Sequence, residues 1–528
     1  MDESQMEQGN PAPNKKPKSR RCAHRIALTA LLFTTLWAVV ILAPGLLDPE
    51  SHSAERKARD RKWVNTSPYF VDRQLCRWFT LCGLHHVRYD PASRSYLEET
   101  HSDEDELRLE LRRLATNAAG SSDQETKPSV ASDIPDYVLK HAPLVHLYSG
   151  EQFWPSDITA HLQHMNITTN TTTSPLLPPP TTPWTLDNLR NLNDINATVF
   201  LQSKQDVEQR PDWLHSAANM PTNFTSIPDR TQQHQPRHPH AKPPPTQPTP
   251  PLLPRGHKPD GEGYSPAPAI LVLVDKGAGI LDAFWFFFYS YNLGQTVLGM
   301  RFGNHVGDWE HCMVRFEHGL PRGAFLSAHS GGHAYAWDAL HKHDNGTRPV
   351  IYSAVGSHAM YATPGDHPYV LPFGLLKDQT DDGPVWDPAL NRLAYFYDFA
   401  ADDEDTTFPE RKNNRTADDD GEPFHPPPVQ LPEDTSQEMQ VDMSPGKRET
   451  LVPASSNPDA PTSWFHYKGY WGDQVYPLAD DRQWRLFGQY HYVTGPSGPK
   501  FKKLGRSQMC PRKKCTILHE LDRLSTWY

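Results

Sequence analysis

The sequence predicts a mainly β protein, built as an antiparallel β-sandwich of jelly-roll type with a few short helices. Many short segments rich in aromatic and β-branched residues follow one another between about residues 134 and 510. Gly-rich turns separate these segments, and several of them alternate apolar with polar residues. This succession is typical of two packed sheets, because each strand buries one face against the opposite sheet.

An apolar segment near the N-terminus predicts a membrane anchor. Residues 1–25 form a polar tail, and Ile26 to Leu47 carries no charge and is long enough to cross a bilayer as a helix. Basic residues precede this run and Asp48 and Glu50 follow it, so the positive-inside rule places the tail in the cytosol and the rest of the chain in the lumen. The expected topology is type II single-pass. A cleaved signal peptide is the alternative, but its apolar region is normally only ~7–15 residues long.

Glycosylation signals agree with this topology. Seven N-x-Ser/Thr triplets without a central Pro lie beyond the apolar run, at Asn65, Asn166, Asn170, Asn196, Asn223, Asn345 and Asn414. The sequence therefore predicts a glycoprotein of the secretory pathway.

The cysteines fit an oxidising lumen. Cys76 lies close to Cys82 and Cys510 close to Cys515, so two local disulfides are expected. A metal knuckle is the alternative for Cys510 and Cys515, although no second pair stands at zinc-finger distance. Cys312 is left over and is expected to be a buried apolar residue.

Charge and composition divide the chain. The formal net charge of −11, without a basic stripe between the two ends, argues against a nucleic-acid partner. Inserts rich in Pro, Thr or acidic residues are expected to be disordered because they cannot bury enough apolar surface. The predicted organisation is an anchor at 26–47, a stalk at 48–132 with a helix near 107–114, a β-sandwich domain at 134–510 interrupted by inserts at 168–182, 228–260 and 401–461, and a tail at 511–528.

The individual elements follow from local patterns. A strand is expected after Pro143, and Ser156 is expected to cap a helix that continues through His161. The aromatic run 283–290 is too short for a spanning helix and fits a strand or core segment. Further strands are expected at 269–276, 295–302, 310–317, 323–329, 349–354, 464–470 and 484–493.

The stretch Gly303-Asn304-His305-Val306-Gly307-Asp308-Trp309-Glu310 carries the most chemistry. In an extended segment Asp308 and Glu310 share one face and Trp309 points the other way. Gly307 permits a bend that turns His305 toward the same face. Two carboxylates and one imidazole suit a hard divalent cation, Mg, Mn or Ca ahead of zinc. The alternative is a strand end whose polar groups face water.

Further polar residues follow in the sequence. His329, His333 and His358 are candidates for ligand binding together with Trp309. A Ser/His/Asp triad from Ser330 or Ser357 with His358 and Asp366 is the alternative, but no Gly-x-Ser-x-Gly elbow frames either serine.

Several motifs in order resemble the fungal vacuolar protein sorting-associated protein 62 family. They are the run from Tyr137 through Asp157, the Gly303–Glu310 motif, Ser327-Ala328-His329-Ser330-Gly331-Gly332-His333, Val355-Gly356-Ser357-His358 and Trp471-Gly472-Asp473. The similarity covers roughly residues 134–165 and 265–510. It implies a membrane-anchored or lumenal protein linked to delivery of cargo to the vacuole, and it supplies no known catalytic activity.

A more distant resemblance is to NPP1-type necrosis-inducing proteins, which carry a Gly-His-Arg-His-Asp-Trp-Glu heptapeptide. Their metal-ligating residues fall on His305, Asp308 and Glu310, with Asn292 a weaker substitute for another acidic ligand. That family folds as a β-sandwich and uses its cation to engage sphingolipid glycan headgroups. Asn304 and Gly307 depart from the heptapeptide, and toxin activity does not carry over.

Three hypotheses follow for function. The first is a binding module for vacuolar sorting, in which a cation on His305, Asp308 and Glu310 coordinates a lipid or glycan headgroup. The second is a metal-assisted hydrolase of glycan or phosphoester bonds, with His333 or His358 as general base. The third is a scaffold without a site.

Overall fold

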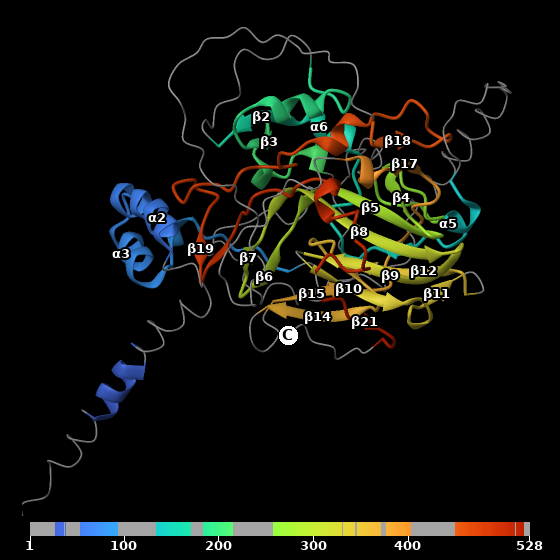
Figure 1. Cartoon of the computed structure of the whole chain (residues 1–528). Coiled ribbons are helices and arrows are strands. Elements are labelled where there is room, and N and C mark those ends of the chain that lie inside the picture. Colours follow the sequence, from blue (N-terminus) through green and yellow to red (C-terminus); the bar gives the residue numbers. More distant parts are fainter. Residues whose placement is uncertain are drawn as a thin grey trace, which may run out of the picture. The chain divides into compact units, whose positions relative to one another are not determined.

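The computed structural model places most of the predicted β region and shorter segments before it (Figure 1). It describes residues 27–35, 37, 53–92, 134–170, 183–214, 257–329, 331–343, 346–370, 376–402, 449–512 and 514–521. These residues belong to two compact units. Unit 1 comprises residues 1–85 with 485–489, and unit 2 comprises residues 86–484 with 490–528.

The described part of unit 1 contains helices and the short strand β19 (Arg485–Leu486). Helix α2 (Ala54–Thr66) begins at Ser53, whose side chain accepts a hydrogen bond from the Arg56 amide. Helix α3 (Phe70–Phe79) follows and contacts α2. The predicted stalk therefore contains folded structure at its start, whereas the helix expected near 107–114 lies outside the described residues.

Unit 2 is built on one eight-stranded sheet, in the order β18-β17-β4-β5-β8-β9-β10-β21. Its strands are β4 (Ala269–Gly277), β5 (Ile280–Asn292), β8 (His305–Glu317), β9 (Leu320–Ala328), β10 (Gly331–Ala336), β17 (Arg392–Tyr397), β18 (Leu451–Pro453) and β21 (Ile517–Leu518). A second sheet has the order β11-β12-β1-β16, with β13 also paired to β12. Its strands are β1 (Leu144–His146), β11 (Lys342–His343), β12 (Arg348–Ser353), β13 (Met360–Tyr361) and β16 (Val385–Trp386).

Smaller elements complete the unit. The pairs are β2 (Met165–Thr169) with β3 (Val199–Ser203), β6 (Gln295–Val297) with β7 (Met300–Phe302), and β14 (Gly365–Val370) with β15 (Leu376–Thr380). Short strands β19 (Arg485–Leu486) and β20 (Gln489–Tyr490) pair with each other, and β19 belongs to unit 1. The helical segments include α5 (Asp136–Lys140), α6 (Ile158–Gln163), η3 (Leu189–Asp194), η11 (Ser463–His466) and η12 (Pro499–Lys502).

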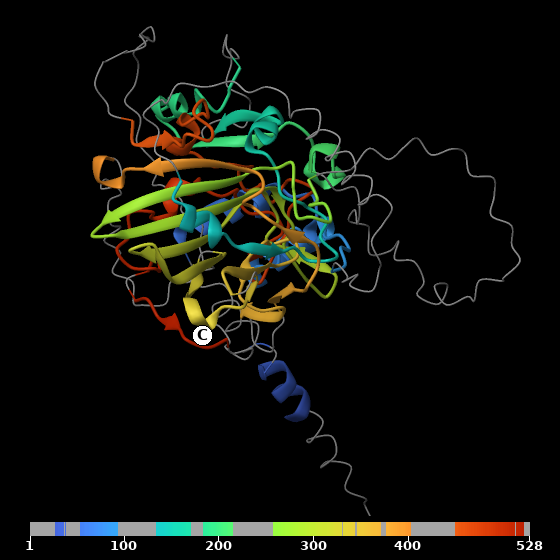
Figure 2. The same ribbon diagram turned by 90° about the vertical axis from the view of Figure 1, so that its right-hand side faces the viewer.

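Both faces of the large sheet are buried (Figures 1 and 2). On one face Trp285 and Phe287 of β5 pack with Val145, Ile351 and Trp386 of the second sheet. The other face packs against α6, β2, β3 and η11, through a core that is rich in aromatic rings. This burial on both sides explains why the run 283–289 is apolar and aromatic throughout instead of alternating.

The mainly β prediction with a few short helices is confirmed, but uniform antiparallel pairing is wrong. The pairs β1–β12, β4–β17 and β10–β21 are parallel. Residues 464–470 do not form the expected strand, because Ser463–His466 is a 3-10 helix. Asp157, not Ser156, caps α6 by accepting from the amides of Thr159 and Ala160. Part of the predicted third insert is ordered as β18.

Several predictions fall largely outside the described residues. Of the anchor at 26–47 the structure describes 27–35 and 37, and within the part of the chain that it describes no helix is both long and apolar enough to cross a bilayer. Most of the three predicted inserts lies outside as well, namely 171–182 of the first, 228–256 of the second and 403–448 of the third. Of the sequons, Asn223, Asn345 and Asn414 are not described, whereas Asn65, Asn170 and Asn196 are exposed and Asn166 is half-buried.

Both predicted disulfides are confirmed. Cys76 is bonded to Cys82 and Cys510 to Cys515. The second bond excludes a metal knuckle formed by those two thiolates. Cys312 is a free, fully buried cysteine on β8, as expected.

Candidate functional site at the start of strand β8

Strand β8 turns Asp308 and Glu310 to one face of the large sheet. Asp308 lies opposite Tyr289 of β5 and Glu310 lies opposite Phe287. Trp309 points to the other face, where it packs against Phe288 and two further tryptophans. The predicted alternation is therefore confirmed. Trp309 is only 1% exposed, so it is a core residue and not the ligand-binding residue that the sequence suggested.

Gly307 brings a distant motif against this strand. Its φ is +69°, and a Cβ at this position would lie 2.2 Å from the carbonyl oxygen of Trp471. Gly472 is equally close, since its Cβ would lie 1.8 Å from the carbonyl oxygen of Val306. The Trp471-Gly472-Asp473 motif thus packs directly on the backbone beside Asp308.

His358 is the main partner of Asp308. Its Nδ1 lies 2.9 Å from the Asp308 carboxylate and its Nε2 lies 3.1 Å from the Phe153 carbonyl oxygen. Because both partners only accept hydrogen bonds, both ring nitrogens carry protons and the ring is an imidazolium. Burial opposes this charge, but the Asp308 hydrogen bond and the charge of Glu151 outweigh burial and raise the pKa of His358. The ring stacks on Tyr289 with centroids 3.6 Å apart.

Glu151 supports His358 from a separate segment. One carboxylate oxygen accepts from the amides of Gln152 and Phe153, at 2.7 and 2.9 Å. The other accepts from the Gly356 amide at 2.8 Å and lies 3.9 Å from Nε2 of His358. Sequence reasoning missed Glu151. Its signal was an acidic residue between the apolar residues of 144–148 and Phe153, a place where a glutamate is buried only if it is paired.

Glu310 has a carboxyl group that is strongly perturbed by its surroundings. Ser327 of β9 donates to it and also accepts from the His311 amide at 2.7 Å. Burial, followed by the charge of Asp308, raises the pKa of Glu310 to about 7, although the charge of Lys502 acts in the opposite direction. Near neutral pH this side chain is therefore divided between its protonated and ionised forms.

Asp378 on β15 forms the second half of the cluster. It accepts hydrogen bonds from Ser357, Tyr361 and Gln295 at 2.7, 2.8 and 2.8 Å. His329 lies 2.7 Å from the same carboxylate. Burial opposes protonation of His329, but Asp378, then Glu310 and Asp308, raise its pKa to about 9. The His329 side chain is 36% exposed, so solvent reaches the cluster on this side.

His305 is the neutral imidazole of the cluster. Its Nδ1 lies 2.7 Å from the Gly307 carbonyl oxygen and therefore donates to it. Burial, aided by the charges of His358 and His329 and opposed by that of Asp308, lowers the pKa of His305. A neutral ring protonated on Nδ1 keeps a lone pair on Nε2. This is the state in which histidine binds a metal ion.

Other predicted site residues take different places. Asn292 donates to the Gly303 carbonyl at 2.9 Å and so holds the turn before β8. His333 lies within electrostatic range of His367 and Arg512, and burial together with these charges lowers its pKa to about 4. The Ser/His/Asp alternative is not assembled from Ser357, because this serine donates to Asp378. Asp366 has an exposed side chain that pairs with Lys377. Ser330 lies outside the described residues.

A compact metal-binding trio is found elsewhere among the described residues. Ligand atoms of Asp60, Cys76 and Cys82 lie within 4.8 Å of one another. The two sulfur atoms are joined in a disulfide, so this trio cannot act as a thiolate site. Among the described residues no such compact group is found around Asp308, where the two carboxylates bond to His358 and Ser327. Direct coordination there requires Glu310 and His305 to turn toward Asp308.

Comparison with known proteins places this region in a family. A model of the family described as vacuolar protein sorting-associated protein 62 matches residues 278–371, which contain β5, β8 and the turn at His358. Vacuolar protein sorting-associated protein 62 of Saccharomyces cerevisiae is 32% identical over 399 residues, covering 72% of this chain and 68% of the relative. The chain belongs to the vacuolar protein sorting-associated protein 62 family. A second member of S. cerevisiae, TDA6, is also named for vacuolar protein sorting and is 33% identical over 425 residues, covering 75% of this chain and 72% of its own length.

Solved structures show weaker likenesses. Necrosis and ethylene inducing protein 2, from the causal agent of cocoa's witches' broom disease, is 12% identical and has a TM-score of 0.19, covering 46% of this chain and 74% of its own. The non-toxic protein HaNLP3 is 16% identical with a TM-score of 0.16, covering 25% of this chain and 52% of its own. Scores this low support no conclusion about the site.

Proposed function

We propose that this protein acts in the targeting of proteins to the vacuole, as a single-pass glycoprotein whose folded units lie in the lumen of the endomembrane system. Family membership supports the sorting role, because the two yeast relatives are named for vacuolar protein sorting. The charge pattern around residues 26–47 and the sequons beyond it support the topology.

The proposed mechanism is binding of a divalent cation by the Asp308 cluster. The observation that supports it is an excess of buried acid. Four carboxyl groups, those of Glu151, Asp308, Glu310 and Asp378, lie in a network with two raised-pKa imidazoles, His329 and His358. Burying unbalanced negative charge is unfavourable, and Glu310 relieves it by taking up a proton. A cation relieves it as well.

The residues fit a hard cation such as Ca, Mg or Mn. Asp308 and Glu310 would supply oxygen ligands and His305 the nitrogen lone pair. When bound, the ion would attract phosphate or hydroxyl oxygens of a lipid or glycan headgroup. Asp308 would stay oriented by His358, and His329, on the exposed side, would meet the headgroup.

Titration of the purified full-length protein with Ca, Mg and Mn tests the mechanism. The wild type is expected to bind one of these ions, and Asp308→Asn is expected to weaken binding at least about tenfold because it removes an anionic ligand. Asp366→Asn is the matched control, since Asp366 is an exposed carboxylate that pairs with Lys377. If neither wild type nor control takes up any of the three ions, the cation mechanism is wrong.

A metal-assisted hydrolase is the second candidate, favoured by the pKa of Glu310. A carboxyl group that titrates at about 7 suits a general acid or base near neutral pH. His358 is less suited to this role because both its nitrogens donate hydrogen bonds. Phosphoester and glycoside substrates are the measurement. The hydrolase hypothesis requires turnover by the wild type that Glu310→Gln abolishes.

A further inference from the structure

Helix α3 of unit 1 exposes its apolar side. Phe70, Val71 and Trp78 are 65%, 67% and 68% exposed, and the preceding Tyr69 is 49% exposed. At 100° per residue, positions 70, 71, 74 and 78 fall on one side of a helix, and Gln74 accepts from the Trp78 indole there. Asp72 and Cys76, on the opposite side, are each only 3% exposed. The usual distribution of apolar and polar side chains is inverted.

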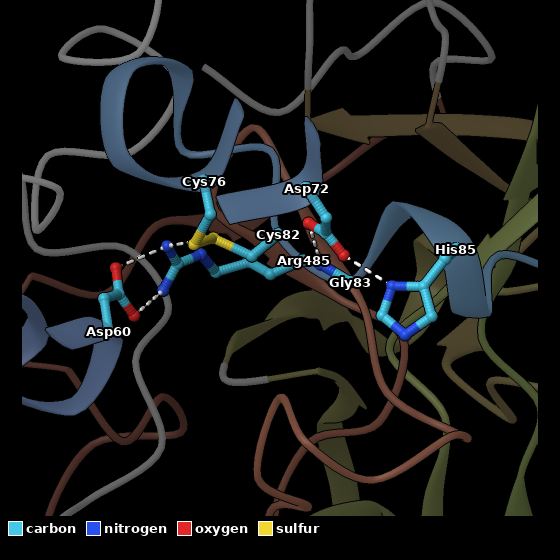
Figure 3. The surroundings of a disulfide bond; sticks show 7 residues. All are labelled: Asp60, Asp72, Cys76, Cys82, Gly83, His85 and Arg485. Atoms are coloured by element: carbon cyan, nitrogen blue, oxygen red, sulfur yellow. Dashed lines mark hydrogen bonds and ion pairs between the residues drawn. A yellow bond between two sulfur atoms is a disulfide. The ribbon is translucent and has the colours of Figure 1, made fainter. Parts of the chain in front are cut away.

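The buried side of α3 is fixed by specific bonds (Figure 3). The Asp72 carboxylate accepts from the Gly83 amide at 2.9 Å and lies 2.6 Å from Nδ1 of His85. The disulfide joins Cys76 to Cys82, whose backbone pairs with that of Arg485. Rolling α3 to bury its aromatic side would break these bonds. The exposed face is therefore a built feature of the unit.

Arg485 strengthens the same set of contacts. Its guanidinium makes two bonds to the Asp60 carboxylate of α2, at 2.9 and 2.7 Å, and lies 3.2 Å from the Cys82 sulfur. This bidentate pair ties α2 to the disulfide, so the two helices present their outer surfaces in a fixed orientation. The Tyr69 ring also lies against His85, with centroids 3.6 Å apart.

We propose that the face of α3 formed by Phe70, Val71 and Trp78 lies in the interfacial layer of the bilayer that holds the anchor. The inference rests on the anchor in the proposed function. Only six residues separate Leu47 from the first residue of α2, a distance of at most ~25 Å in extended chain. Unit 1 is thereby confined to the neighbourhood of the membrane surface.

The chemistry of the surface favours lipid over a protein partner. Trp and Tyr concentrate at membrane–water interfaces because one part of the ring system is apolar and the other forms hydrogen bonds. Exposed cations also lie on the two helices of this unit, with Lys57, Arg61 and Lys62 on α2 and Arg77 on α3. Their long side chains can extend to lipid phosphates while the rings insert.

Depth measurement on the full-length chain tests the proposal. The protein is reconstituted into vesicles of phosphatidylcholine and phosphatidylserine, with an NBD fluorophore on Phe70→Cys or Trp78→Cys in a Cys22→Ser background. These exposed positions tolerate the label, and Cys312 is buried. Leu298→Cys is the control, because Leu298 is an apolar residue of unit 2 that is 84% exposed.

Quenching of the NBD emission by brominated lipids distinguishes the outcomes. We expect the chain to float with the vesicles and the emission at 70 and 78 to fall about twofold, with no change at 298. Floating chains without quenching at 70 and 78 would overturn the docking of α3 and leave the anchor intact. A blue shift at these positions that is independent of bromination would show that a second copy covers the face, which also overturns the proposal. Chains that do not float would refute the anchor itself.

Discussion

The side chains around Asp308 form a network in which bound protons offset part of the negative charge of the carboxylates. The carboxylate partners of His358 and His329 raise the pKa of both rings and favour their protonated forms. Burial lowers the pKa of His305, and the pKa of Glu310 is about 7. Each of these states follows from the contacts of the residue and not from its type. Two histidines with the same unperturbed pKa therefore take opposite roles, one as a cation and one as a candidate ligand.

Glu310 predicts a specific pH dependence of stability. Its pKa is raised from 4.5 in the unfolded chain to about 7 in the folded protein, so the folded state binds the proton more tightly. This contribution is fully present below pH 4.5 and is lost as the pH rises to about 7, and its upper limit is about 3 kcal/mol. In metal-free buffer Glu310→Gln should lose this slope, measured by urea unfolding at pH 4.5 and 7.5.

A cation should change the same measurement. If Ca, Mg or Mn binds at Glu310, saturating ion should lower its pKa and flatten the wild-type slope, and binding should release a proton below pH 7. Equal slopes in wild type and Glu310→Gln without metal would show that this carboxyl group is not the source of the effect.

The residues of the cluster differ in how far the sequence reveals them. Asp308 and Glu310 could be placed on one face because the side-chain period of a strand is two. Glu151 and Asp378 could not be found, since they stand about 160 residues before and about 70 residues after Asp308 in the sequence. Only tertiary packing brings them to His358 and His329. Local sequence patterns do not predict contacts between residues so far apart in the chain.

Among the secondary-structure elements, β5 and β8 determine the site. Their antiparallel register puts Tyr289 beside Asp308, and the stack of Tyr289 on His358 completes the arrangement. These strands were predictable from their apolar runs. The parallel pairing of β1 with β12 was not, because these strands are separated by about 200 residues and their pairing depends on the path of the chain between them. The aromatic segment 464–470 fits a strand and a core-facing 3-10 helix equally well by composition.

Gly307 provides a prediction at this scale. Gly307→Ala should destabilise the protein by about 3 kcal/mol, because the new Cβ meets the Trp471 carbonyl and the backbone is left-handed. Gly277→Ala is the matched control. Gly277 has a φ of +75° with open space around it, so only the backbone strain of about 1–2 kcal/mol applies. Chemical unfolding measures both, and equal losses would contradict the steric argument.

For the whole molecule, the proposed lumenal placement predicts which sequons carry glycans. Asn65, Asn170 and Asn196 are exposed, whereas Asn166 is half-buried in β2 and paired with Gln202 of β3. Replacing each exposed asparagine by Gln should remove one glycan from protein made in yeast, seen as one step in gel mobility. Asn166→Gln should change mobility least. Insensitivity of the wild type to endoglycosidase would place these residues in the cytosol.

The contact of Gly307 with Trp471 also sets an order for biosynthesis. The segment before Asp308 and the segment after Trp471 share a backbone contact that includes Gly472 and Gly495. A nascent chain that has emerged only as far as β8 lacks half of this contact. The surroundings of Asp308 are therefore completed only after nearly the entire polypeptide has been synthesised, and prematurely terminated products lack this contact.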